Sequence, residues 1–163
     1  SRWRVALGAG GTDGHVELID ESYNANPTSA RAALEVLGAA PAIDGVGRIT
    51  KGRRIAFLGD MLELGPEEHA MHAAIAEADE LAEIDQIHSC GSLMKSLHDA
   101  LPRAKRGEWF ENSTELAAHA RRALDAGDVA MVKGSLGSRM AVVVEAIRKI
   151  GAAERIDVTE GAD

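Results

Sequence analysis

Arg54-Ile55-Ala56-Phe57-Leu58-Gly59-Asp60 has the composition of a buried strand that ends in a turn. Its apolar residues follow one another without alternation, which is typical of a strand covered on both faces in a parallel sheet. Pro66 suits the first turn of a helix, which we expect from about Glu67 to Ala82. A strand followed by a helix begins a βαβ unit, whose right-handed crossover places the next strand parallel in the same sheet.

The same alternation extends along the rest of the chain. After this helix we expect strands at 84–89, 108–110 and 129–132, and helices at 92–101, from 113 to near 127, and at 138–150. Before it, the pattern indicates strands at 2–7 and 15–19, a glycine-rich turn at 8–14, a helix from Pro27 or Thr28 to about 37, and a flexible loop at 38–52. The predicted fold is α/β: a Rossmann-like three-layer α/β/α domain at 1–151, with a mostly parallel sheet of about six strands and then a disordered tail at 152–163.

The composition limits the class of protein. The 163 residues suit one domain, and 45% of them are apolar while 3% are aromatic, which favours helices packed on an aliphatic sheet. A net charge of −8 opposes binding to a nucleic-acid backbone. Cys90 is the single cysteine, so no intramolecular disulfide can form, and no apolar run has the length that a bilayer requires. We expect a cytoplasmic protein without nucleic acid or membrane as a partner, and we interpret the start without Met as that of an excised domain.

Ligand sites in parallel sheets lie at the carboxyl ends of the strands, where loops lead into helices. This rule selects the segments 20–27, 59–65, 90–92 and 133–139. In the second of them, Asp60 or Glu63 can either bind a substrate amine or order a loop.

The densest polar cluster at a predicted strand end is Asp20-Glu21-Ser22-Tyr23-Asn24-Ala25-Asn26-Pro27. Its carboxylates can accept hydrogen bonds from sugar hydroxyls, and its asparagines can pair with an amide or a nucleobase edge. Aspartate and asparagine also form turns that cap the following helix, so the residues alone leave both roles open. The run contains more polar groups than a turn requires, which favours a binding function.

A second candidate site is Lys133-Gly134-Ser135-Leu136-Gly137-Ser138-Arg139, which opens the last predicted helix. Main-chain N–H groups at a helix start, together with two cations, can hold a phosphate or a carboxylate. The alternative is an ordinary glycine-rich turn with solvated cations.

No catalytic residue and no metal site are predicted. His69 and His72 are one helical turn apart, but no further ligand is in register, and we interpret both as surface histidines. Cys90 is interpreted as a buried residue without a catalytic partner. The sequence lacks the phosphate loop G-x-x-x-x-G-K-[ST], and the run at 8–14 does not match a dinucleotide fingerprint.

Three motifs, in this order, resemble the Mur ligase family: residues 20–27, Leu58-Gly59-Asp60-Met61-Leu62-Glu63-Leu64-Gly65, and Val132-Lys133-Gly134-Ser135. They are most similar to MurF-type ligases, which join D-alanyl-D-alanine to UDP-N-acetylmuramoyl-tripeptide. The resemblance extends to about Gly151 and departs from the family pattern at Glu21, Leu136 and Ala141. It implies the C-terminal domain of a three-domain enzyme that activates a carboxylate with ATP to an acyl phosphate, which the amine of the dipeptide then attacks. The phosphate loop and the ligands of Mg²⁺ are expected in the central ATPase domain.

The resemblance also implies roles for single residues. Those expected near the nucleotide are Arg2, Asp20, Tyr23 and Asn24. Those expected near the dipeptide substrate are Asn24, Asn26, Asp60, Lys133, Ser135 and Arg139. On family grounds the cofactors are ATP and Mg²⁺, the partners are the two substrates and the protein's own central domain, and the protein is a monomer. Two alternatives stay open: a stand-alone flavodoxin-like ligand-binding domain, and a Mur or folylpolyglutamate-type ligase that takes a single amino acid.

Overall fold

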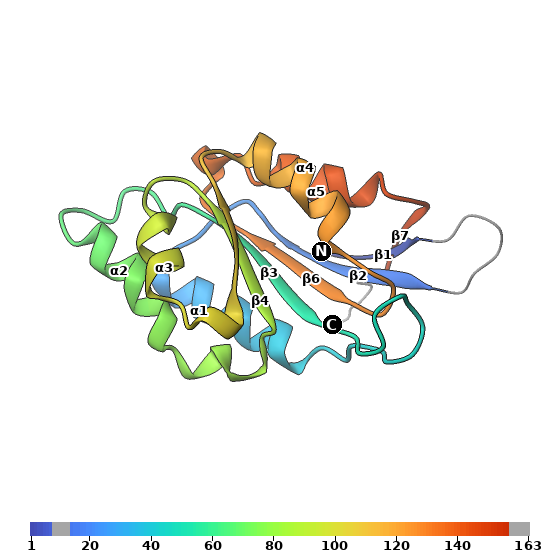
Figure 1. The fold of residues 1–163 in the computed structure, drawn as a ribbon. Helices are drawn as coiled ribbons and strands as arrows, with labels where there is room; N and C mark the ends of the chain where they lie inside the picture. Colours follow the sequence, from blue (N-terminus) through green and yellow to red (C-terminus); the bar gives the residue numbers. More distant parts are fainter. Residues whose placement is uncertain (8–13, 157–163) are drawn as a thin grey trace.

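A computed structural model describes residues 1–7 and 14–156 (Figure 1). The strands form a seven-stranded sheet in the order β5-β4-β3-β6-β2-β1-β7. Their bounds are β1 Arg2–Ala6, β2 His15–Glu21, β3 Arg54–Gly59, β4 Gln86–Cys90, β5 Arg106–Phe110, β6 Val129–Lys133 and β7 Ala153–Arg155. The five strands from β5 to β2 in that order are parallel. β1 is antiparallel to β2, and β7 is antiparallel to β1. The predicted α/β class is confirmed, with seven strands in place of about six.

Helices cover both faces of the sheet. The α-helices are α1 Pro27–Ala39, α2 Glu68–Ala74, α3 Met94–Ala100, α4 Ser113–Ala123 and α5 Ala141–Arg148. The short 3₁₀ segments are η1 Ile75–Glu77, η2 Asp79–Glu83, η3 Arg103–Lys105 and η4 Leu136–Ser138. α1, α2 and α3 lie on one face of the sheet, and α4 and α5 lie on the other (Figure 1). Each face has its own apolar cluster, as a sheet buried on both sides requires.

The single long helix predicted from Glu67 to Ala82 is wrong. α2 ends at Ala74 and is followed by η1, an extended Ala78, and η2. Ile75 and Leu81 are both buried in the same apolar cluster. In one continuous helix, residues six apart point about 120° away from each other, so the break allows both side chains to reach the core.

The loop predicted at 38–52 begins after Ala39, where α1 ends, and its part at 42–52 is irregular, as predicted, but tethered. Main-chain N–H groups of Ile49 and Arg53 donate to the carboxylates of Asp125 (2.6 Å) and Asp128 (2.9 Å), both of which are buried. Burial raises the pKa of the Asp125 carboxyl, but main-chain donors around it outweigh that effect, and its pKa lies below the ordinary value. The expectation of a flexible loop is therefore corrected, because its partners lie in a distant part of the sequence.

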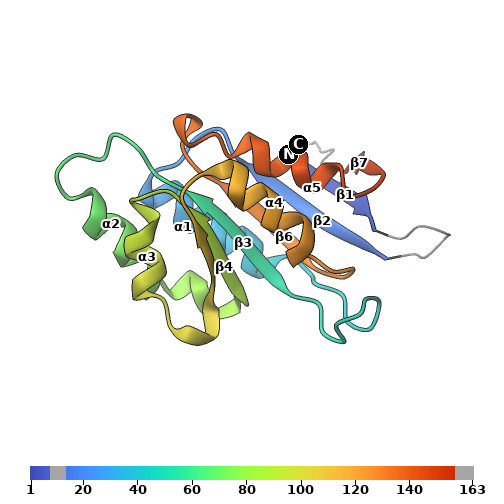
Figure 2. The ribbon, with the colours of Figure 1, turned by 45° about the horizontal axis from the view of Figure 1, so that its top comes forward.

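The end of the chain departs from the predicted tail. Residues Ala153–Arg155 pair with β1 as an edge strand, and the Ile156 N–H donates to the Arg2 carbonyl at 3.0 Å (Figure 2). Polar composition suggested disorder here, but main-chain pairing needs no apolar side chain. The remaining tail, 157–163, and residues 8–13 of the turn predicted at 8–14 lie outside the described residues. Within the described part, no helix is both long and apolar enough to cross a membrane.

Two histidines lie in the apolar layer between the sheet and α4. The His88 ring stacks on Phe57 with centroids 5.2 Å apart and meets His119 edge-on at 4.8 Å. His88 Nδ1 accepts the Glu108 N–H at 3.0 Å, so the neutral ring carries its proton on Nε2. Burial lowers the pKa of His88 to about 4, and repulsion from His119 and Arg53 adds to this effect.

We predict that His88 makes the folded state sensitive to acid. Its folded pKa of about 4 lies below the unfolded value of 6.5, so the unfolded chain binds the proton first as the pH falls. The free energy of unfolding should be unaffected by this group above pH 6.5 and should fall by about 3 kcal/mol between pH 6.5 and 4. Urea unfolding at a series of pH values measures this slope.

His88→Asn keeps an acceptor near the Glu108 N–H but does not titrate. This variant should lose most of the slope between pH 6.5 and 4, whereas His69→Asn, at an exposed helical position, should keep it. An unchanged slope in His88→Asn would show that other groups cause the acid sensitivity.

Candidate functional site

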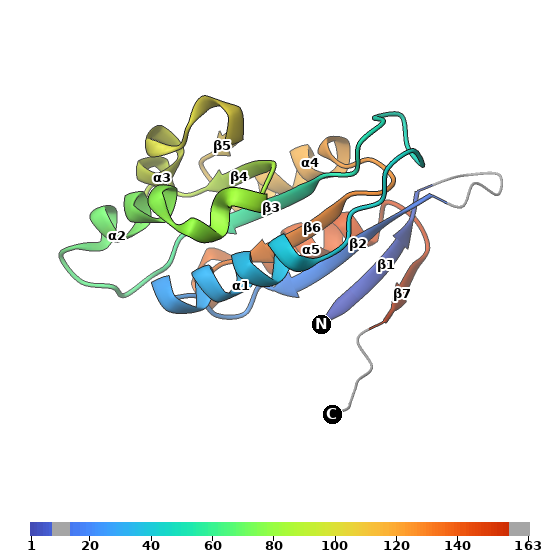
Figure 3. The same cartoon turned by 90° about the horizontal axis from the view of Figure 1, so that it is seen from below.

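The four predicted segments meet at one edge of the sheet. β2, β3, β4 and β6 are parallel and adjacent, and their arrowheads point to the same edge in Figure 3. We call this the carboxyl edge and the opposite one the amino edge. Because β1 is antiparallel to β2, the start of β1 with Arg2 also lies at the carboxyl edge.

Ser135 joins three of the loops at the carboxyl edge. Its N–H donates to the Asp60 carbonyl at 3.2 Å, and its Oγ accepts the Leu62 N–H at 2.8 Å. The same hydroxyl donates to the Ala25 carbonyl at 3.4 Å. The loops after β2, β3 and β6 are therefore connected through one side chain and its main chain.

Lys133 is buried at the end of β6, with 4% of its surface exposed. Its Nζ donates to the Asn24 carbonyl at 2.7 Å and lies 3.6 Å from Oε1 of Glu21. A cation that leaves water needs such partners. The structure thus places this predicted ligand-binding lysine inside the domain, holding the loop after β2.

Asp60 connects the fourth segment. Its carboxylate accepts the main-chain N–H groups of Met94 at 2.8 Å and Leu93 at 3.4 Å. A side chain at Gly91, whose φ is +105°, would overlap this carboxylate. Of the two roles considered for Asp60, the geometry shows the ordering of a loop.

The segment 20–27 contains both turn-forming and exposed side chains. Oδ1 of Asp20 accepts the Ser22 N–H at 3.0 Å and its hydroxyl at 2.6 Å, which closes a turn. Asn26 is the N-cap of α1, in a capping box with Ser29. Asn24 and Tyr23 are exposed, Tyr23 to 60%. The turn and the cap considered from sequence are both present, and they leave Tyr23 and Asn24 open to a ligand.

The acidic residues of this segment raise the pKa of the Tyr23 phenol. The nearby Glu21 carboxylate, partial burial and Asp20 all raise the pKa of Tyr23.

Arg2, expected near a nucleotide, pairs with Glu17 at 2.9 Å on the neighbouring strand. The side chain of Arg2 is half-buried, and only the main chain before it reaches Asp20, whose N–H donates to the Ser1 carbonyl at 2.8 Å.

Arg139 stands apart from the other predicted residues. It is exposed and has a φ of +60°, at the corner between η4 and α5. Among the described residues, the only other non-glycine with a positive φ is Glu63, on the loop after β3. Left-handed conformations are unfavourable for residues with a Cβ and tend to persist at functional sites. Both strained residues lie on loops of the carboxyl edge.

His72 is a residue of this edge that the sequence did not reveal. It is fully buried, its Nε2 accepts the Met61 N–H at 2.9 Å, and its Nδ1 donates to the Glu68 carbonyl at 2.6 Å. The interpretation of His72 as a surface histidine is wrong. Its spacing of three residues from the buried Ile75, on the same helical face, is the signal that could have indicated burial.

We predict that His72→Leu destabilises the domain by about 1–3 kcal/mol, since the Met61 N–H would be buried without an acceptor. His72→Gln, whose amide oxygen can replace Nε2 as the acceptor, should recover part of this loss. His69→Ala, one turn away and exposed, should change the free energy of unfolding by less than about 0.5 kcal/mol. Equal effects of His72→Leu and His69→Ala in urea unfolding would contradict the role of this hydrogen bond.

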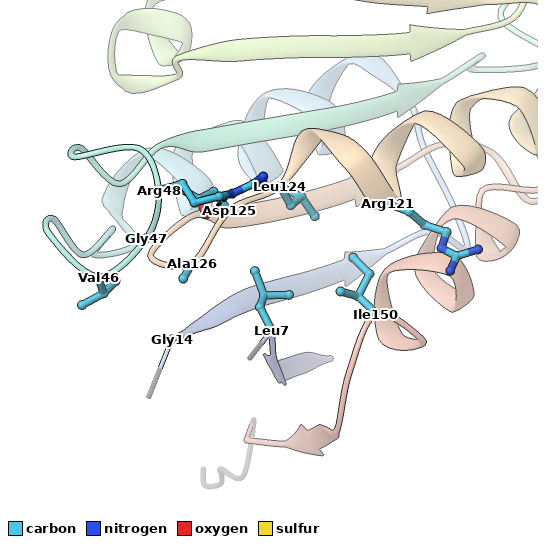
Figure 4. A pocket seen from close by; sticks show the side chains of 10 residues that line it. All are labelled: Leu7, Gly14, Val46, Gly47, Arg48, Arg121, Leu124, Asp125, Ala126 and Ile150. Carbon is cyan, nitrogen blue, oxygen red and sulfur yellow. Dashed lines mark ion pairs between the residues drawn. The ribbon is translucent and has the colours of Figure 1, made fainter. Parts of the chain in front are cut away.

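A cavity of about 440 Å³ lies at the amino edge, away from these residues (Figure 4). Leu7, Leu124 and Ile150 form much of its apolar wall, and the Arg48 guanidinium lies 3.7 Å from the Asp125 carboxylate. None of the residues that the sequence selected for binding lines it. The polar groups of the candidate site are at the other end of the strands.

The described residues contain no cluster of three or more His, Cys, Asp or Glu side chains that could hold a metal ion. Cys90 is buried and burial raises the pKa of its thiol to about 12, with the Asp60 charge adding to this, so it is a poor nucleophile. The chemistry that the carboxyl edge offers is binding and orientation by hydrogen bonds and charge.

Comparison with known proteins identifies relatives over most of the chain. The family model described as "Mur ligase, glutamate ligase domain" matches residues 4–136. UDP-N-acetylmuramoyl-tripeptide--D-alanyl-D-alanine ligase of Escherichia coli (strain K12) is 35% identical over 136 residues, which cover 82% of this chain and 27% of the relative. The enzyme of the same name from Bacillus subtilis (strain 168) is 26% identical, over 82% of this chain and 28% of the relative. The chain therefore spans little more than a quarter of the length of these curated relatives.

Solved structures show the same fold. MurF ligase from Thermotoga maritima in complex with ADP matches 88% of this chain and 30% of its own, with a TM-score of 0.65 and 21% identity. A crystal structure of MurF from Acinetobacter baumannii matches 82% of this chain and 28% of its own, with a TM-score of 0.66 and 23% identity.

Proposed function

This chain belongs to the Mur ligase family, in the part described as the glutamate ligase domain, and from this premise we propose that it is the C-terminal domain of a MurF-type ligase. The proposed whole enzyme uses ATP to join D-alanyl-D-alanine to UDP-N-acetylmuramoyl-tripeptide in peptidoglycan precursor synthesis. The relatives at up to 35% identity that carry this activity in their names support the proposal. The motifs at 20–27, 58–65 and 132–135, which distinguish this type of ligase, lie together at the carboxyl edge.

The reaction divides naturally between domains. ATP phosphorylates a carboxylate of the UDP-linked peptide to give an acyl phosphate and ADP, and the dipeptide amine then attacks the acyl carbon and displaces phosphate. ATP and Mg²⁺ would be bound mainly by a central ATPase domain outside this chain. The described residues offer no cluster of metal ligands, and we assign Mg²⁺ no contact here.

The domain's own residues would bind and orient. Tyr23 and Asn24, exposed beside the Asp20 turn, are available to a nucleotide, and Arg2 lies at the same edge. Asn24, Asn26 and Arg139 are exposed to an incoming dipeptide, while Asp60, Lys133 and Ser135 hold the loops that carry them. Closure of this edge over the central domain would exclude water from the acyl phosphate, which otherwise hydrolyses.

We predict that the full reading frame containing this segment releases ADP only when UDP-N-acetylmuramoyl-tripeptide, ATP, Mg²⁺ and D-alanyl-D-alanine are all present. D-alanine or L-alanyl-L-alanine should not replace the dipeptide, and the segment of residues 1–163 alone should release no ADP. Equal release with single amino acids would assign another ligase specificity, and no release with any acceptor would favour a stand-alone binding domain.

Tyr23→Ala in the full-length protein should raise the KM for ATP by about tenfold, which corresponds to a lost stacking or hydrogen-bonding contact of roughly 1–1.5 kcal/mol. The Tm should be unchanged because Tyr23 is exposed. Tyr23→Phe separates the two contacts, since it keeps the ring and removes the hydroxyl. An unaltered KM for ATP in Tyr23→Ala would remove this residue from the nucleotide site.

A further inference from the structure

The cavity of about 440 Å³ at the amino edge adjoins a second hollow beside α4. The second hollow measures about 320 Å³, and the residues that line it are Ala118, Arg121, Arg122 and Ile150. We call it the arginine hollow, and we call the larger one the amino-edge cavity. Arg121 and Ile150 line both of them, so the two hollows share a wall. None of their lining residues belongs to the site at the carboxyl edge.

The arginine hollow carries positive charge without a counter-ion. Arg121 and Arg122 are exposed in the last turn of α4, and among the described residues neither guanidinium has a hydrogen bond or an ion pair. The acidic side chain that lines the amino-edge cavity is Asp125, which already accepts the Ile49 N–H and lies 3.7 Å from Arg48. In a chain with a net charge of −8, this pair of arginines is a local exception that can hold an anion.

The amino-edge cavity adds an apolar surface beside these cations. A helix dipole also favours cations at a C-terminus, so the two arginines alone would not indicate a ligand. Figure 4 shows the side chains of Leu7, Leu124 and Ile150 between those of Arg48 and Arg121. Leu7 and Ile150 pack on the apolar cluster under α4 and α5, which fixes the surface that they present. The cavity has the volume of a small-molecule site, and its apolar wall leads to the cations.

We infer that the amino edge binds an amphipathic anion, a molecule with one aliphatic chain and a carboxylate or phosphate head. The head lies in the arginine hollow against Arg121 and Arg122, and the chain lies along Leu7, Leu124 and Ile150. The wall shared by the two hollows places both parts of such a ligand next to each other. This inference goes beyond the proposed ligase function and does not depend on it, because no residue of the carboxyl edge takes part.

Titration calorimetry of the full-length protein with decanoate, decyl phosphate and decanol tests this inference. Both anions should bind below the concentrations at which they form micelles. Decanol should bind at least tenfold more weakly than decanoate, because it makes no charge-assisted hydrogen bond to a guanidinium. From hexanoate to decanoate the affinity should rise about two- to fourfold for each added methylene. The ratio of the affinities for decanoate and decyl phosphate then shows which head the site prefers.

Ala118→Glu is the variant that tests the arginine hollow without removing a side-chain contact. Position 118 is exposed on α4, and a carboxylate there precedes Arg121 and Arg122 by three and four residues, the spacing at which ion pairs form on a helix. This carboxylate should compete with the head of the ligand and reduce the affinity for decanoate by tenfold or more, while the Tm stays the same or rises. Ala118→Gln, of the same length but uncharged, should keep the affinity within about twofold.

The double variant Arg121→Gln, Arg122→Gln removes the cations themselves. It should also reduce the affinity for decanoate by tenfold or more and leave the affinity for decanol unchanged. Arg103→Gln, at an exposed arginine of η3, is the matched control for the loss of positive charge and should bind decanoate like the wild type.

Several results would overturn the inference. They are equal affinities for decanoate and decanol, equal binding of decanoate by Ala118→Glu and Ala118→Gln, and no saturable binding of either anion. A loss in Arg103→Gln as large as in the double variant would also overturn it, because net charge and not the hollow would then govern binding. Absence of dipeptide-dependent ADP release would refute the proposed ligase function and leave this inference standing.

Discussion

The hydrogen bonds that leave the end of β6 hold the candidate site together. Lys133 is the last residue of the central strand and Ser135 follows it, and they contact the loops after the two strands that flank it, β2 and β3. Asp60 extends the connection to the start of α3. Because β6 is paired on both sides and buried throughout, its end is a fixed point, and the neighbouring loops take their positions from it.

This arrangement explains why several polar side chains of the motifs make hydrogen bonds to main-chain groups of the domain. A loop at the end of a parallel strand has main-chain groups without partners in the sheet, and buried groups of this kind need hydrogen bonds. Lys133, Ser135, Asp60 and His72 supply them. The residues left exposed, such as Tyr23 and Arg139, are then presented on a preorganised surface, which lowers the entropic cost of binding.

At both edges of the sheet, side chains hold the loops through hydrogen bonds to main-chain groups, but the side chains differ between the two edges. At the amino edge, Asp125 and Asp128 tether the loop 42–52 through main-chain N–H groups, and Arg53 pairs with Asp128 at 2.8 Å. At the carboxyl edge the loops are held by hydrogen bonds of Lys133, Ser135, Asp60 and His72. Two residues of these loops, Glu63 and Arg139, have a left-handed φ. The two non-glycine residues with a left-handed φ among the described residues therefore both lie at the carboxyl edge, which supports its proposed role in binding.

The sequence by itself determined the α/β class with its mostly parallel sheet, the edge at which the polar loops gather, and the family. These could be predicted because periodicity, glycine turns and motifs are local properties of the chain. It also indicated the turn at Asp20 and the cap at Asn26, whose partners lie within three residues. Only the tertiary structure decided that Lys133 is buried, that His72 supports the loop after β3, that α2 breaks at Ala74, and that Ala153–Arg155 form an edge strand. These features depend on how segments far apart in the sequence pack against each other. Lys133 and its partner Asn24, for example, are 109 positions apart, and no local pattern indicates such a contact.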